Sequence, residues 1–243
     1  MNNPSGDLQR LNDSLQKQWG ISNTKISLKV LKNLQYNLRK GKWCVTCAVF
    51  NETNEIINIW PGFLNSSLYG IAIDLGSTTI AAHICDLSTG EIINSSDIMN
   101  PQIRFGEDLM SRVSFSMMNE DGTEKLKDAV QETLNELCKK LIKDSKIDHK
   151  LVVEISIVCN PVMHHLLLGI NPIELGQAPF ALATSDSLYF KSEELALNSL
   201  LNSTVFILPC IAGHVGADAA AVVLSEAPNE SNETVLILSL IHI

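Results

Sequence analysis

Residues 74–79, with the sequence DLGSTT, include the residue types that a phosphate-binding loop needs. Gly76 has no Cβ and tolerates unusual dihedral angles, so the backbone can approach a phosphate closely. Ser77, Thr78 and Thr79 supply hydroxyl and amide donors for phosphate oxygens. Asp74 would hold a hydrated magnesium ion that bridges the terminal phosphates. The alternative is a plain hairpin with a Gly-Ser turn, and the setting of the loop in its strand pair favours the nucleotide site.

Two further segments place polar or flexible residues where ligands gather in α/β folds. Asn160 follows an apolar run, Val152 to Cys159, that predicts a buried strand. Asn160 would therefore reach outward from the carboxyl edge of the sheet. Gly213 and Gly216 lie just before a predicted helix, where free backbone amides form a second possible anion site.

Two pairs of residues suggest a metal site, and we interpret both as structural. His164 and His165 are neighbours on a predicted helix, so their side chains point about 100° apart and do not face one ion together. Cys44 and Cys47 form a C-x-x-C pair. They lie in an alternating run that predicts a strand, on which residues three apart point to opposite faces.

The elements that must position these residues begin with a small α+β domain, predicted over residues 1–60. Leu8, Leu11, Leu15 and Trp19 recur at helical spacing before Gly20. The other elements predicted there are a strand through Ile26, Leu28 and Val30, a helix from Leu31 to Leu38, and strands at 43–50 and 55–59. Residues 61–68 are rich in turn formers and are the predicted linker.

Residues 69–233 alternate between strands and helices and predict a single α/β lobe. Three strands, at 70–74, 78–85 and from 91, form an antiparallel meander. A capping box at Asp121 and Glu124 opens a helix, and strands at 152–159 and 204–208 alternate with helices at 163–168 and 215–224. Three antiparallel strands continued by alternating helix and parallel strand predict a ribonuclease-H-like lobe. A last strand is predicted at 234–238.

Composition excludes several classes of function. The net charge is −9, from 18 Lys and Arg against 27 Asp and Glu residues, which argues against a nucleic-acid partner because phosphate binding needs clustered cations. No apolar stretch approaches the ~20 residues that span a bilayer, and the first residues lack a signal-peptide pattern. Widely spaced cysteines fit free thiols in a reducing compartment. We therefore expect a cytoplasmic protein without a membrane partner.

The loop in its strand pair resembles that of the superfamily of acetate and sugar kinases, heat-shock chaperone ATPases and actin, in which two such lobes close over ATP. Three more segments narrow the resemblance: NPQIRFGEDLMSR at 100–112, CNPVMHHLLLG at 159–169 and PCIAGHVGAD at 209–218. In order and spacing the four motifs are similar to those of the ATP-dependent reductive activators of corrinoid proteins. The resemblance covers about residues 7–236.

The resemblance implies ATP and Mg²⁺ as ligands, and a corrinoid protein of a methyltransferase system as partner. Its inactive cob(II) cofactor would be returned to the cob(I) state. The segment that contains His214 and Asp218 corresponds to a helix start that faces the terminal phosphate, so either residue could orient water or could simply cap the helix. Arg104, Glu107 and Asp108 would line the cleft or the partner surface, with a solvated loop as the alternative.

Members of that family also carry an amino-terminal iron–sulfur domain, with a C-x4-C-x2-C ligand run, and a second lobe. The resemblance therefore implies a chain truncated at both ends and inactive alone, with the iron–sulfur cluster in the missing domain. Residues 234–237 are expected to begin the second lobe. Residues 238–243, LSLIHI, are expected to be read-through of a sequencing adapter, with a genuine apolar strand end as the alternative.

Two other functions remain open from the sequence. A small-molecule kinase of the same superfamily would need a catalytic carboxylate beside a substrate hydroxyl, and Asp218 is the candidate. A non-enzymatic module would use the lobe and the small leading domain only to dock a partner.

Overall fold

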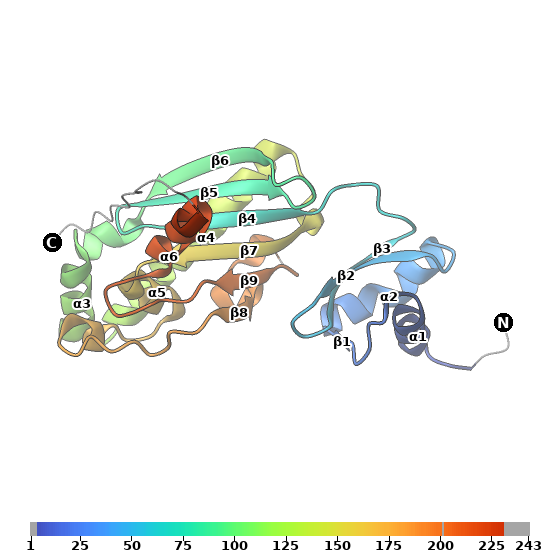
Figure 1. Cartoon of the computed structure of the whole chain (residues 1–243), viewed down its shortest axis with the longest axis horizontal. Helices are drawn as coiled ribbons and strands as arrows, with labels where there is room; N and C mark the ends of the chain where they lie inside the picture. Colours follow the sequence, from blue (N-terminus) through green and yellow to red (C-terminus); the bar gives the residue numbers. More distant parts are fainter. Residues whose placement is uncertain (1–3, 201, 231–243) are drawn as a thin grey trace. The chain divides into compact units, whose positions relative to one another are not determined.

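The computed structural model describes residues 4–200 and 202–230. The chain forms two compact units, Met1–Ser67 and Leu68–Ile243 (Figure 1). No helix in the described part of the chain is both long enough and apolar enough to cross a bilayer.

The first unit packs two helices against a three-stranded sheet. Its elements are α1 (Asp7–Trp19), β1 (Lys25–Ile26), α2 (Leu28–Lys40), β2 (Val45–Phe50) and β3 (Glu55–Pro61). The strand order is β1-β3-β2, with β1 parallel and β2 antiparallel to β3. Its core is formed by seven buried side chains, namely Leu11, Leu15, Val30, Leu34, Leu38, Ile56 and Ile59. The helical spacing of leucines in both helices is thus explained by burial of one face.

The predicted strand through Ile26, Leu28 and Val30 is wrong beyond Ile26. The Ser27 hydroxyl accepts a hydrogen bond from the Val30 amide at 3.3 Å and so caps the start of α2. A serine cap satisfies an amide that has no partner within the helix. Val30 then joins the buried face of α2, while Leu28 is 67% exposed. The alternation of three apolar residues was therefore not a strand pattern.

The second unit contains a six-stranded mixed sheet. Its strands are β4 (Tyr69–Leu75), β5 (Thr79–Asp86), β6 (Ile92–Met99), β7 (Val152–Cys159), β8 (Leu188–Lys191) and β9 (Thr204–Ile207). The order is β6-β5-β4-β7-β9-β8. Strands β4, β5 and β6 form an antiparallel meander, and β7 and β9 continue parallel to β4. This topology confirms the predicted ribonuclease-H-like α/β lobe, and β8 adds an antiparallel edge strand that the sequence pattern did not predict.

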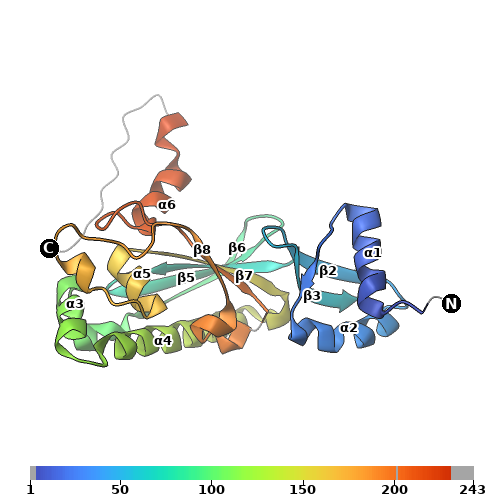
Figure 2. The ribbon, with the colours of Figure 1, turned by 90° about the horizontal axis from the view of Figure 1, so that it is seen from below.

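Helices lie on both faces of this sheet (Figures 1 and 2). They are α3 (Leu109–Met118), α4 (Gly122–Ser145), α5 (Pro161–Leu168) and α6 (Ala217–Glu226). Short 3-10 turns lie at η1 (Pro101–Phe105), η2 (His149–Leu151), η3 (Ile173–Gly176), η4 (Ser192–Leu195), η5 (Asn198–Leu200) and η6 (Pro228–Glu230). Both views show α4 on one face of the sheet and α6 on the other (Figures 1 and 2). Along β4, Ile71 and Ile73 are buried toward the helical core, whereas Ala72 and Asp74 are exposed on the opposite face.

One other local prediction is wrong. Asp121 makes no capping hydrogen bond to α4, and its carboxylate instead pairs with Lys125 at 2.9 Å. Glu107 and Asp108 are exposed between η1 and α3, where Asp108 accepts a hydrogen bond from the Ser111 amide at 2.6 Å and caps α3. Their role in lining a cleft or a partner surface stays a prediction. The strand predicted at 234–238 and the adapter-like residues 238–243 lie outside the described residues.

Candidate functional site

In the loop between β4 and β5, three successive carbonyl groups accept hydrogen bonds from Asn100 and Arg112. Asn100 Nδ2 donates to the Gly76 carbonyl at 2.8 Å, and Arg112 Nη2 donates to the Ser77 carbonyl at 2.5 Å. The Asn100 amide donates to the Thr78 carbonyl at 2.8 Å. Within residues 4–200 and 202–230, neither the amides nor the hydroxyls of Ser77 and Thr78 have a hydrogen-bond partner. The loop therefore presents unused donors, as an anion site requires.

Gly76 is needed because the loop is crowded. A Cβ at this position would lie 2.4 Å from the Thr79 carbonyl oxygen. The φ angle of Gly76 is not in the left-handed region, so the expected need for an unusual dihedral is not the reason. Thr79 itself begins β5, where it is exposed and pairs with Met99 of β6. Close packing of the turn is what excludes a larger residue.

Arg112, on α3, is a buried cation whose role the sequence analysis missed. Its side chain is fully buried, and Nε donates to the Gly106 carbonyl at 3.0 Å. Burial lowers the pKa of Arg112 to about 10, and the charge of Asp108 opposes this effect. Arg112 therefore stays charged at neutral pH. Its only signal in the sequence was its place in the motif after Asn100, since a charged residue in a helix is usually solvated.

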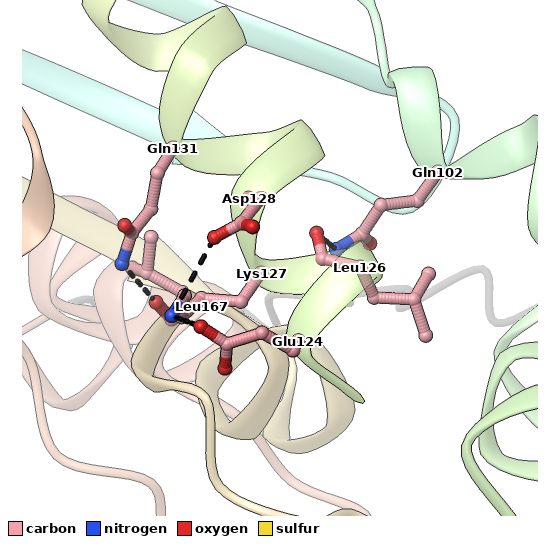
Figure 3. A network of polar contacts seen from close by, with 7 residues as sticks. All are labelled: Gln102, Glu124, Leu126, Lys127, Asp128, Gln131 and Leu167. Atoms are coloured by element: carbon pink, nitrogen blue, oxygen red, sulfur yellow. Dashed lines mark hydrogen bonds and ion pairs between the residues drawn. The ribbon is translucent and has the colours of Figure 1, made fainter. Parts of the chain in front are cut away.

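Two buried glutamines extend this support to the helices (Figure 3). Gln102 accepts from Arg112 Nη1 at 3.3 Å and donates through Nε2 to the Leu126 carbonyl of α4 at 2.8 Å. Gln131 of α4 donates to the Leu167 carbonyl of α5 at 2.9 Å. A buried side-chain amide lowers the stability of a fold unless it has a hydrogen-bond partner. The phosphate-loop candidate is thus connected through Arg112 and Gln102 to the long helix that covers the sheet.

Asp74 and Asp218 form a pair of carboxylates at the end of the sheet. Desolvation raises the pKa of Asp74, the negative charge of Asp218 raises it further, and the nearby His83 lowers it. Asp218 lies in the first turn of α6, where its Oδ1 accepts from the Ala219 amide at 2.8 Å. Two carboxylates that repel each other favour a cation between or beside them.

The carboxylate pair fits Mg²⁺ bound together with phosphate. In residues 4–200 and 202–230, no group of three or more His, Cys, Asp or Glu side chains gathers to hold a metal ion. Magnesium commonly uses one or two carboxylates, several waters and the phosphates of a nucleotide. Asp74 and Asp218 supply two carboxylates, a number that such a magnesium–nucleotide complex can use.

Gly216 allows α6 to start against the end of β7. A Cβ on Gly216 would lie 2.5 Å from the Cys159 carbonyl oxygen, 2.6 Å from Asn160 Cα and 2.6 Å from Asp218 Oδ1. Real Cβ atoms do not occur at such distances, so any side chain would push the segment away. This contact brings the start of α6, with Asp218, to the carboxyl ends of β4 and β7.

Asn160, His214 and Gly213 are further predicted site residues, and each contacts other parts of the protein. Asn160 Oδ1 accepts from the Met163 amide at 2.9 Å and caps α5, so only the rest of its amide is available to a ligand. His214 packs its ring on Phe180, with the ring centroids 4.2 Å apart. Gly213 lies against the same residue, since a Cβ there would be 2.1 Å from the Phe180 carbonyl oxygen. The phosphate-binding roles of Asn160 and Gly213, and the role of His214 in orienting water, stay predictions.

A pocket of about 470 Å³ opens on the face of the sheet that α4 leaves uncovered. Its walls are Ala72, Ile73, Asp74, His83, Ser156, Val158, Phe206 and Leu208. His83 lies opposite Ala72 on β5, and its Nδ1 is 2.7 Å from Ser95 Oγ. The sequence analysis missed His83, although alternation along β5 puts it on the same face as Asp74. The pocket combines an apolar wall with Asp74 and His83 at one side.

The His164–His165 and Cys44–Cys47 pairs, whose sequence suggested a metal site, have other contacts and positions in the structure. His165 Nδ1 is 2.9 Å from the Pro161 carbonyl, and its Nε2 accepts from the Ala183 amide at 3.0 Å. That pattern requires a neutral ring with its proton on Nδ1. Cys47 lies on β2 against the small core, and burial raises its pKa to about 11. Cys44 precedes β2 and is exposed, so the prediction that both thiols lie on one strand is wrong.

His164 predicts a loss of stability in mild acid. Its ring is fully buried, neither nitrogen has a partner among the described residues, and burial lowers its pKa from 6.5 to about 4. The unfolded chain therefore binds more protons between these values, and the free energy of unfolding falls as pH drops below 6.5. His164→Leu should remove about 2 kcal/mol of this fall between about pH 7 and about pH 5, as measured by urea unfolding.

His149→Leu is the matched control, because His149 is exposed at η2 beside Asp148. This change should leave the dependence of stability on pH close to that of the original chain. An equal effect of the two substitutions would show that the buried ring is not the cause.

Comparison with known proteins places this architecture in a family. Residues 69–229 match the family model described as the RACo middle region, and residues 1–66 match the model of the RACo linker region. The chain belongs to the RACo family. The resemblance to reductive activators of corrinoid proteins is thereby confirmed.

Two RACo relatives illustrate the extent of the similarity. The chain is 34% identical over 172 residues to the corrinoid activation enzyme RamQ of Eubacterium limosum, which covers 70% of this chain and 29% of RamQ. A solved structure named as a reductive activator for corrinoid, iron–sulfur protein matches with a TM-score of 0.83 and 29% identity, over 96% of this chain and 37% of that one. The chain thus spans about a third of the length of each relative.

Proposed function

We propose that this chain provides the first phosphate-binding lobe of an ATP-dependent activator that reduces corrinoid proteins. The observation that carries the proposal is the loop from Gly76 to Thr78. Its carbonyls accept hydrogen bonds from Asn100 and Arg112, while the donors of Ser77 and Thr78 have no partner among the described residues. The names of RamQ and of the solved activator support the corrinoid protein as the partner.

In this proposal the loop holds the terminal phosphates of ATP. The amides and hydroxyls of Ser77, Thr78 and Thr79 donate to phosphate oxygens, and Asp74 holds Mg²⁺ through water. The start of α6 adds the positive end of a helix dipole on the other side of the phosphates. Asn160, Gly213 and Gly216 complete that second wall. The position of Asp218 beside Asp74 favours it over His214 as the group that orients water.

The energy of ATP would serve a one-electron reduction of cobalt from Co(II) to Co(I). The electron would come from a low-potential iron–sulfur centre of a longer RACo protein, and the nucleotide would shift the lobes so that the corrinoid accepts it. Both the reduction and the partner concern the whole protein, of which this chain matches about a third. The role proposed for the chain itself is phosphate and magnesium binding.

Asp74→Asn tests the magnesium–nucleotide site in the chain as it is. The substitution should lower the affinity for ATP in the presence of Mg²⁺ by about tenfold or more, which corresponds to about 1.4 kcal/mol, as measured by calorimetry. Because desolvation and the repulsion by Asp218 both raise the pKa of Asp74, the unliganded variant should be as stable as the original or more stable. Loss of binding would then not be due to unfolding.

Asp97→Asn is the control, since Asp97 is exposed on β6 in the same lateral row as Asp74 and Ala81. It should bind nucleotide as the original chain does. Equal affinity of the Asp74 variant and the original would contradict the proposed magnesium role.

The corrinoid function is tested in RamQ by replacing its matching segment with this chain. The chimera, supplied with a corrinoid protein, a low-potential reductant and Mg²⁺, should form the Co(I) absorption spectrum only when ATP is added. The chimera with Asp74→Asn should lose this dependence. Equal Co(I) formation with and without ATP would reject the function, and calorimetry on the chain alone would still report on the phosphate site.

A further inference from the structure

The first unit is basic, although the chain as a whole is acidic. Residues 1–67 contain eight Lys and Arg against four Asp and Glu, whereas residues 68–243 contain 10 against 23. Half of the basic residues of the first unit lie on α2, and that helix contains no acidic residue. Protein surfaces usually mix both signs of charge. A helix with cations only, in an acidic chain, therefore points to a ligand of opposite charge.

The basic residues of α2 share its outward face with an aromatic ring. Val30, Leu34 and Leu38 pack into the core, so the opposite side of the helix faces water (Figure 2). Lys32 and Lys40 lie there, one turn to each side of Tyr36, which is 62% exposed. The Lys40 ammonium group lies 5.5 Å from the centre of the Tyr36 ring.

A second aromatic ring follows directly after α2. Trp43 is 41% exposed, and the guanidinium groups of Arg10 and Arg39 lie over its ring at 5.2 and 5.0 Å. Arg39 is also ion-paired with Asp7. The φ angle of Trp43 is 69°, after 51° at Lys42. Left-handed backbone is uncommon for a bulky residue and tends to occur at functional sites.

We propose that Lys32, Tyr36, Arg39, Lys40 and Trp43, together the α2 surface, bind an acidic surface of a protein partner. Charge complementarity sets the sign of the partner, and Tyr, Trp and Arg are the residues most enriched at the centres of protein interfaces. Thirteen residues of helix are about 20 Å long, the dimension of a protein contact. The inference does not rest on nucleotide binding.

An acidic protein surface fits better than a nucleic acid. A polynucleotide extends its charge well beyond one short helix, and the excess of acidic residues in 68–243 would repel it. A folded partner confines its negative charge to one patch. The α2 surface should therefore prefer a carboxylate-rich polypeptide over a phosphate polymer of equal charge.

The test uses a fluorescent oligo-glutamate peptide and its anisotropy during titration with the chain. Binding should be observed at about 20 mM salt and weaken strongly by about 300 mM, where the Debye length is short. The double substitution Lys32→Glu with Lys40→Glu should weaken binding at least about tenfold. The matched control is Lys139→Glu with Lys143→Glu, which makes the same change in net charge at exposed positions of α4 and should retain the affinity within about twofold.

Folding and the alternative partners are controlled in the same series. Thermal unfolding should be similar for both double variants, because all four lysines are exposed. Trp43→Gly, which suits the left-handed backbone, should also weaken peptide binding without lowering stability. The proposal is overturned by equal weakening in both double variants, by tighter binding of an oligo-thymidylate of equal charge, or by a salt-sensitive dimer of the chain that excludes the peptide.

Discussion

Arg112→Met should lower the free energy of unfolding by about 3 kcal/mol and abolish nucleotide binding. Arg112 is fully buried and donates to the carbonyls of Ser77 and Gly106 and to Gln102. Methionine fills a similar length but donates no hydrogen bond, so the buried Gln102 acceptor and the two partly buried carbonyls are left unpaired. The Ser77 carbonyl is then free to rotate, and the amides of the loop lose their orientation. Urea unfolding measures the first effect and calorimetry with MgATP the second.

Arg104→Met is the matched control for this prediction. Arg104 is exposed on η1, and its guanidinium lies over the Phe105 ring at 4.7 Å. Loss of one exposed cation–π contact should cost about 0.5 to 1 kcal/mol, well below the loss expected for Arg112→Met. If the two variants lost the same stability, the buried hydrogen bonds of Arg112 would not be what holds the loop.

Gly216→Ala should cost about 2 kcal/mol and separate Asp218 from Asp74. The added methyl group would lie 2.5 Å from the Cys159 carbonyl oxygen, so the start of α6 must move away from the end of β7. Since the charge of Asp218 raises the pKa of Asp74, this movement should bring the pKa of Asp74 toward its usual value. NMR titration of the Asp74 carboxyl group measures the shift, and it reports on geometry even where stability changes little.

Gly6→Ala controls for the loss of a glycine at a helix start. Gly6 and Gly216 both precede a helix, with extended backbone and no side-chain cap, but a Cβ on Gly6 would meet nothing within 4 Å. This variant should change stability by less than about 1 kcal/mol. An unshifted Asp74 pKa in Gly216→Ala would contradict the proposed placement of α6.

Much of the lobe could be predicted from the sequence because its signals are local. The alternation of Ile71 and Ile73 with Ala72 and Asp74 marks a strand with one buried face. The turn of small residues after Asp74 and the apolar run from Val152 are likewise recognised from neighbouring residues. The family resemblance also rests on short contiguous motifs. One error is also local: a cap at Ser27 began a helix where the apolar pattern predicted a strand.

The sequence by itself determined the phosphate-loop candidate, the ribonuclease-H-like lobe and the RACo family, since each depends on residues close together in the chain. The tertiary structure alone decided which distant residues serve that loop. Arg112 reaches the Ser77 carbonyl from α3, and the charge of Asp218 acts on Asp74 because Gly216 lets α6 pack on β7. Such pairings depend on where separate elements meet in space, and a pattern along one chain does not contain that information.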